Sequence, residues 1–114
     1  MNIISLDTKA KEFAQAVKET EEYSNLNAAQ ARIKLDPVAQ ELINELEESQ
    51  RRIQEGQAQG QQVNSEVQSF QLLQQKAMAN ETLKRFFQAQ QDFSKVMEEA
   101  NQIITNELFG QISS

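Results

Sequence analysis

The scarcity of residues that interrupt helices is the strongest constraint on what this chain can fold into. Its 114 residues include three glycines and one proline, against roughly eight and six at average usage. Between these few breaks, apolar residues recur at spacings of three and four, the pattern of one helical face. No segment alternates apolar and polar residues for long enough to indicate a strand. The sequence therefore predicts an all-α fold.

The candidate helix starts are marked by capping residues. Asp36 precedes Pro37, and an aspartate before a proline is typical of an N-cap followed by the first helical residue. Asn80 is a second candidate cap, and Ser65 with Gln68 has the spacing of a capping box. We expect Asp36 and Asn80 to stabilise the two longest helices.

These starts, with Gly56, Gly60 and Gly110 as stops, divide the chain into helices. The break between the first two rests on Thr20 and is the weakest of the boundaries. The sequence predicts about five helices, over residues 6–19, 21–34, 37–58, 65–78 and 81–109. We expect them to form an elongated antiparallel bundle with one long C-terminal helix. The length predicts a single domain, residues 1–114, ordered from about 6 to 110.

The composition excludes several kinds of site. The chain has no His, Cys or Trp, so it cannot form a Cys/His zinc site, a disulfide, an iron–sulfur cluster on its own thiolates or a Ser-His-Asp triad. Three scattered glycines cannot build a phosphate-binding loop. We therefore expect no enzymatic activity, no catalytic, metal or cofactor-binding residues, and no cofactor.

The charge balance also restricts the partners. Seventeen acidic residues against eleven basic ones give a net charge of −6, whereas a nucleic-acid binder needs a basic surface. No window approaches the ~20 apolar residues of a membrane span, and the first residues have neither the basic nor the apolar part of a signal peptide. We expect no nucleic acid or membrane partner, and a cytoplasmic location.

Acidic and aromatic clusters have simpler interpretations than a site. Glu47 and Glu48 precede Arg51 and Arg52 by four residues, the favourable order for surface ion pairs. The phenylalanines of the last helix lie at helical spacing, which favours packing over a ligand pocket. Nine of the 18 glutamines lie between residues 54 and 75; we interpret this region as a polar helix surface with an exposed hairpin tip.

The last predicted helix is too long for one compact globule. Twenty-nine residues span about 43 Å, whereas a domain of this size is roughly 35 Å across, and the apolar positions continue to the end of the helix. An exposed stripe of this kind is best covered by a second copy of the chain. The sequence predicts a homodimer whose seam consists of Phe93, Met97, Ala100, Ile104 and Leu108.

Three segments together resemble a known family. They are residues 21–26 (EEYSNL), 36–40 (DPVAQ) and 79–91 (ANETLKRFFQAQQ), followed by an ending at Ile103-Ile104. This pattern resembles the YlbF/YmcA/YheA family of small helical bacterial proteins over about residues 6 to 110. The matching residues are helix caps and core positions, so the resemblance carries over no catalytic residue.

The resemblance implies a cytoplasmic, all-α and commonly dimeric protein. In the YlbF and YmcA branches it implies a complex with a third protein, YaaT, which supports competence, sporulation, biofilm development and mRNA processing. That complex carries iron–sulfur clusters bound through Cys. This chain has no Cys, which places it nearest the YheA-like branch.

Two functions remain open at this point. The chain is either a non-enzymatic regulatory adaptor that binds proteins through helix surfaces, or a small-ligand or metal-binding helical bundle. Gln30 and Gln90 fall in otherwise apolar stripes, but no carboxylate clearly does. That distribution favours the adaptor; the protein partners themselves are not identified by the sequence.

Overall fold

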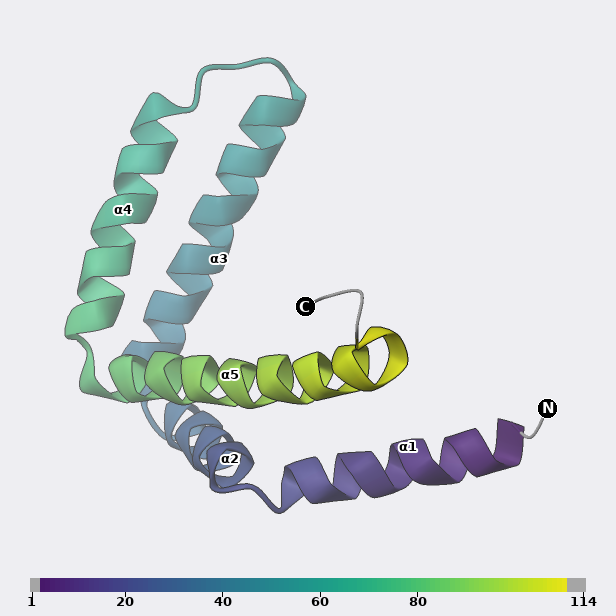
Figure 1. The fold of residues 1–114 in the computed structure, drawn as a ribbon. Coiled ribbons are helices and arrows are strands. Elements are labelled where there is room, and N and C mark those ends of the chain that lie inside the picture. The colour runs from purple at the N-terminus through teal and green to yellow at the C-terminus, as the bar shows by residue number, and fades with distance from the viewer. Residues whose placement is uncertain (1–2, 111–114) are drawn as a thin grey trace. The chain divides into compact units, whose positions relative to one another are not determined.

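The computed structural model describes residues 3–110, and within this range the chain forms five α-helices and no strand (Figure 1). The helices are α1 (Ile3–Lys18), α2 (Glu21–Lys34), α3 (Pro37–Ala58), α4 (Asn64–Ala79) and α5 (Glu81–Phe109). The predicted all-α class and the long C-terminal helix are confirmed. The predicted bounds of α2, α3 and α5 agree with the structure, and α1 and α4 begin earlier than predicted by three residues and one residue.

The α3–α4 hairpin is held by the turn that joins its helices. Gly60 adopts the left-handed conformation, with φ of 71°, which glycine tolerates without strain. The Gly60 N–H donates to the Gln57 carbonyl at 3.1 Å, and the Gln61 N–H donates to the Gly56 carbonyl at 2.9 Å. This pair of bonds is a Schellman motif, which ends α3 and returns the chain so that α4 lies antiparallel beside it (Figure 1).

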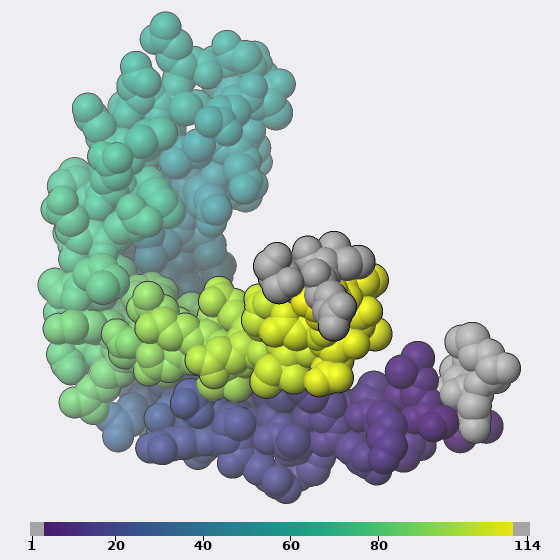
Figure 2. Space-filling view, viewed as in Figure 1, coloured from purple at the N-terminus to yellow at the C-terminus, as the bar shows by residue number. Residues whose placement is uncertain are grey.

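Small side chains let these helices approach closely. Ala39 on α3 and Ala77 on α4 are buried together with Leu83, which follows at the start of α5. Five half-buried apolar residues pack around them: Ile33, Leu42, Ile43, Leu46 and Phe87. Side chains fill the space between the α3 and α4 ribbons (Figure 2). The hairpin and the adjoining helix ends therefore share one apolar core.

The chain divides into two compact units, residues 29–87 and residues 1–28 with 88–114. The first contains the core just described. In the second, the Tyr23 ring on α2 lies 5.9 Å from the Phe93 ring on α5, with the planes tilted by 53°. Most of α1 is exposed, as are residues 101–109 of α5. Apolar burial is therefore concentrated in the first unit.

One predicted cap is wrong. The capping box at Ser65 and Gln68 does not form, because α4 begins at Asn64 with Val63 in the cap position and no side-chain cap bond. Thr20, the weakest of the start signals, does act as a cap: the Tyr23 N–H donates to its hydroxyl at 3.2 Å. In the hairpin, the tertiary turn rather than a local cap decides where α4 begins.

Candidate functional site

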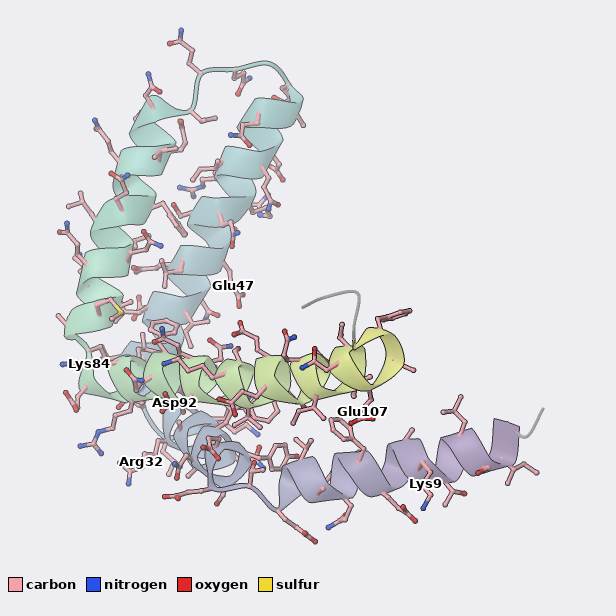
Figure 3. The ribbon with its side chains drawn as sticks, viewed as in Figure 1. Lys9, Arg32, Glu47, Lys84, Asp92 and Glu107 are labelled. Carbon is pink, nitrogen blue, oxygen red and sulfur yellow. The ribbon has the colours of Figure 1, made fainter. Side chains whose placement is uncertain are left out.

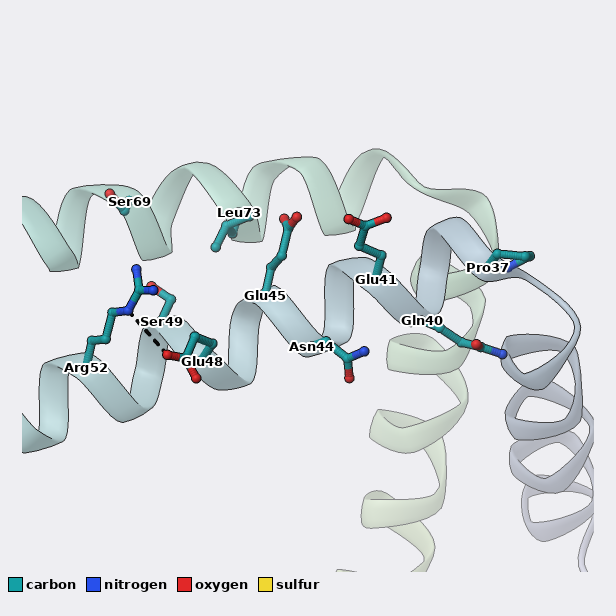
Figure 4. A pocket seen from close by; sticks show the side chains of 10 residues that line it. All are labelled: Pro37, Gln40, Glu41, Asn44, Glu45, Glu48, Ser49, Arg52, Ser69 and Leu73. Carbon is teal, nitrogen blue, oxygen red and sulfur yellow. Dashed lines mark ion pairs between the residues drawn. The ribbon is translucent and has the colours of Figure 1, made fainter.

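A groove runs along the α3–α4 hairpin, with a volume of about 660 Å³ (Figure 4). In this view Glu41 and Glu45 extend from α3 toward α4, and Leu73 supplies an apolar patch on the α4 side. The groove is open to solvent along its length. Eight of the ten lining residues are polar or charged, although apolar atoms make up slightly more than half of the lining surface; the ten are Pro37, Gln40, Glu41, Asn44, Glu45, Glu48, Ser49, Arg52, Ser69 and Leu73.

The charged residues at the end of this groove neutralise each other. Arg52 Nε lies 3.4 Å from Glu48 Oε1. Arg51 Nε donates to Glu48 Oε2 at 3.1 Å, and Arg51 also pairs with Glu55. The hydrogen bonds and charge of Arg51 lower the pKa of Glu48, and the hydrogen bonds that Arg51 donates to Glu48 and Glu55 raise the pKa of Arg51. Arg51 thus pairs with Glu48 and Glu55, and not with Glu47 as the spacing suggested.

The other acidic groups do not converge. A second, smaller groove lies where α2 and α5 adjoin, and it is lined by Glu21, Glu22, Asn25, Asp92, Lys95, Val96 and Glu99. Over residues 3–110, no three carboxylates come close enough to hold a metal ion. Neither groove therefore has the converging donors of a metal or catalytic centre.

The two predicted caps, Asp36 and Asn80, lie at neighbouring helix junctions. The Ala39 N–H donates to Asp36 Oδ1 at 3.2 Å, and the Leu83 N–H donates to Asn80 Oδ1 at 3.0 Å. Asp36 also accepts a hydrogen bond from Thr82, and this bond, followed by the one from Ala39, lowers its pKa below the ordinary value of 3.8. No local sequence signal indicates the Thr82 contact, because it joins the starts of α3 and α5 across 46 residues.

The hairpin tip combines a glycine packed closely against a side chain with one isolated carboxylate oxygen. A Cβ on Gly56 would lie 2.6 Å from Val63 Cγ1, so a larger residue there would displace the Val63 side chain. Glu66 Oε2 is buried and has no hydrogen-bond partner among the residues that the structure describes. The rest of the tip is exposed and rich in glutamine.

The five predicted seam residues fall into an inner and an outer group. Phe93, Met97 and Ala100 are half-buried, and Phe93 contacts Tyr23 of the same chain. Ile104 and Leu108 are 45% and 68% exposed. The outer positions are therefore available to a partner, whereas the ring of Phe93 already packs within the chain.

Exposed apolar side chains gather on the helices at the two ends of the chain. Among the described residues, eleven large apolar side chains are exposed, and seven of them belong to α1 or to the last seven residues of α5: Ile4, Leu6, Phe13, Ile103, Ile104, Leu108 and Phe109. The apolar residues of α1 were not identified as surface from the sequence. The three-and-four spacing that could have revealed them is the same in core and interface helices.

In the part of the chain that the structure covers, no helix combines the length and apolar character needed to cross a bilayer.

Residues 6–108 match the family model described as control of competence regulator ComK, YlbF/YmcA. A UPF0342 protein of Staphylococcus saprophyticus is 31% identical over 106 residues, covering 92% of this chain and 93% of that protein. A UPF0342 protein of Staphylococcus aureus strain JH9 is 32% identical over 108 residues, with the same coverage of both chains.

Solved structures share the fold. A protein of unknown function (DUF964) from Bacillus stearothermophilus superposes with a TM-score of 0.76 at 26% identity, covering 91% of this chain and 92% of that one. A structure of Bacillus subtilis RicA in complex with RicF also matches, with a TM-score of 0.78 at 14% identity. The match covers 96% of this chain and 97% of the matched chain. At that identity the second match establishes the fold alone.

Proposed function

This chain belongs to the YlbF/YmcA family, and on that basis we propose that it is a non-enzymatic regulatory adaptor that acts by binding proteins. The observation that carries the proposal is the apolar surface on α1 and the end of α5, where seven large side chains are exposed. Soluble proteins rarely leave such surface uncovered unless it binds something. We place the protein in the cytoplasm, nearest the YheA-like branch of its family.

The alternative, a small-ligand or metal-binding bundle, has weaker support. The larger groove is open, and the carboxylate of Glu48 is already paired with Arg51 and Arg52. Binding pockets for small molecules are usually concave and largely apolar with a few converging polar groups. The structure of RicA in complex with RicF contains a chain with this fold, and a protein partner is what we propose here.

One of the proposed partners is a second copy of the chain. The predicted seam supports this, because Ile104 and Leu108 remain exposed at the outer end of α5. A two-fold dimer would bury the same apolar surface from both copies. We propose that the homodimer is the form in which the adaptor meets its other partners.

Affinity capture with matched baits tests the adaptor function. We would compare the wild-type chain, Leu108→Asp and the control Leu72→Asp in extracts of the native host, with an unrelated acidic helical protein as background. Leu72 is also exposed, at 60%, but lies on α4. We expect host proteins that bind wild type and the Leu72 variant and are at least ten-fold depleted with the Leu108 variant. No protein enriched above background by any bait would contradict the proposal.

A further inference from the structure

The apolar residues of α1 form a stripe that is exposed except at its last position, Val17, which is half-buried. Leu6, Ala10, Phe13 and Val17 follow one another at spacings of four, three and four, so they lie on one face of the helix. Leu6 is 65% exposed and Phe13 39% exposed, and Ala10 is exposed beside them. We call these four residues the α1 stripe. A helix with this pattern pairs with another helix in folded proteins.

The outer part of α5 carries a matching stripe. Met97, Ala100, Ile104 and Leu108 follow at spacings of three, four and four and form what we call the α5 outer stripe, with Ile103, 63% exposed, beside it. The α1 stripe and the α5 outer stripe each extend over eleven residue steps, about 16 Å of helix. The two stripes are equal in length and each is exposed over part of that length, so each is suited to the other.

Charge distinguishes the possible pairings of these stripes. Residues 97–109 contain three acidic residues, Glu98, Glu99 and Glu107, and no basic residue. Helix α1 contains three lysines and two acidic residues. Packing α5 against α5 of a second copy would bring six carboxylates together, whereas packing α5 against α1 pairs a negative segment with a weakly positive one.

The charged residues nearest the stripes also favour pairing α1 with α5. Lys9 flanks the α1 stripe, one turn before Phe13, and Glu107 flanks the α5 outer stripe beside Leu108 (Figure 3). In the single chain Lys9 is paired with Glu12 at 3.2 Å, and both side chains are more than half exposed. An exposed pair of this kind is weak, so Lys9 can exchange it for a carboxylate of a partner.

We propose that α1 of one copy packs its stripe along the α5 outer stripe of a second copy, and that the second copy does the same in return. This inference rests on the proposed self-association and specifies its geometry: the seam residues are covered by the partner's N-terminal helix and not by its α5. In this arrangement both stripes of each chain are buried, one against each helix of the partner. The arrangement therefore closes as a two-fold dimer and leaves neither stripe exposed.

The exposed apolar surface of α1 and the outer part of α5 is large enough for the core of a stable dimer interface. Leu6, Phe13, Ile103, Ile104 and Leu108 together offer on the order of 500 Å² per chain. With a polar rim around it, such a core belongs to a standard stable interface, which buries roughly 800 Å² per partner. The reciprocal arrangement uses all five side chains in each copy, whereas a contact between two α5 helices would leave Leu6 and Phe13 uncovered.

The absence of cysteine allows a direct cross-linking test. Ala10→Cys and Ala100→Cys each place a thiol near the middle of one stripe. The two thiols therefore lie close together whether the paired helices run parallel or antiparallel. The two single variants, one carrying a mass tag, are co-expressed, purified together as the full chain and treated with a short bismaleimide. Gln57→Cys, at the exposed tip of the hairpin, replaces either variant as the control.

We expect the mixed product of the Ala10 and Ala100 variants to exceed either self-linked product at least five-fold, and the pairs with Gln57→Cys to give background. A dominant Ala100–Ala100 product would overturn the α1 exchange while leaving a dimer. In the double variant Ala10→Cys/Ala100→Cys, a link formed only within one chain would also overturn it. A monomer by sedimentation with no product between chains would overturn both the exchange and the proposed self-association.

Discussion

The α3–α4 hairpin and the two end segments, α1 and the outer part of α5, carry the same kind of apolar stripe and differ in what covers it. In the hairpin, Ala39 and Ala77 are at most 1% exposed, and Leu83 at the adjoining start of α5 is 0% exposed. In the end segments, Leu6 and Leu108 are more than 60% exposed. The helical pattern is equally regular in both regions, so the pattern by itself does not decide burial.

The connection between the helices accounts for the difference. The Schellman turn at Gly60 brings α3 and α4 together over a few residues, so little loop-closure entropy opposes their pairing. Helix α1 and the outer part of α5 lie at opposite ends of the chain, and no short turn joins them. A helix face without a local partner is free to bind another molecule.

Truncation of Leu83 has the largest expected effect. Leu83 is 0% exposed, so Leu83→Ala leaves a cavity and should lower the free energy of unfolding by about 2–5 kcal/mol. The control Leu35→Ala removes a side chain that is 84% exposed and should change stability by less than about 0.5 kcal/mol. Urea denaturation followed by circular dichroism measures both. Equal effects would show that the hairpin core is not the stable part.

A charge on the α5 outer stripe should separate the copies without unfolding them. Ile104→Glu and Met97→Glu should each raise the dimer dissociation constant at least 100-fold, equivalent to about 2.7 kcal/mol. Sedimentation equilibrium at micromolar concentration should give twice the chain mass of 13.0 kDa for wild type and one chain mass for these variants. Leu72→Glu on α4 should remain dimeric; if it dissociates instead, the hairpin and not α5 holds the seam.

Loss of the Asn80 cap should have a smaller effect. Asn80→Ala removes the acceptor of the Leu83 N–H and should destabilise the protein by ~1 kcal/mol. Asn80→Ser keeps an acceptor and should retain most of the stability. The midpoints of urea denaturation test this, and an alanine variant as stable as wild type would mean that α5 does not need its cap.

The titration of Asp36 should have the smallest effect. Its pKa in the folded chain is below 3.8 because Thr82 and Ala39 donate hydrogen bonds to the ionised form. The ionised group therefore stabilises the fold above pH 3.8, and this contribution disappears as the pH falls through the lowered pKa. Asp36→Asn can still cap α3 but does not titrate. Its melting temperature should fall less than that of wild type between pH 5 and pH 2; parallel curves would contradict the assignment.

The single domain expected from the length stays a proposal. The chain contains two compact units, and α2 and α5 each continue through the boundary between them without a break. We propose that this continuity makes the units unfold together. The denaturation curves of the Leu83 variant test the proposal, because separate units would give two transitions.

The sequence by itself determined the helices and most of their ends. Asp36 before Pro37, Asn80 before Glu81 and Gly60 in the hairpin are local signals, because a cap or a left-handed residue acts on backbone groups within a few positions. These signals placed α2, α3 and α5 correctly. The absence of His and Cys likewise excluded whole classes of site from composition alone.

Only the tertiary structure decided which apolar faces are buried. The sequence could not predict that Phe93 packs on Tyr23, that Thr82 donates to Asp36, or that the stripe of α1 is exposed. Each of these depends on contacts between residues far apart in the chain, whereas helical spacing records only that one side of a helix is apolar. The same stripe serves as core where a turn supplies a neighbour and as a binding surface where none is supplied.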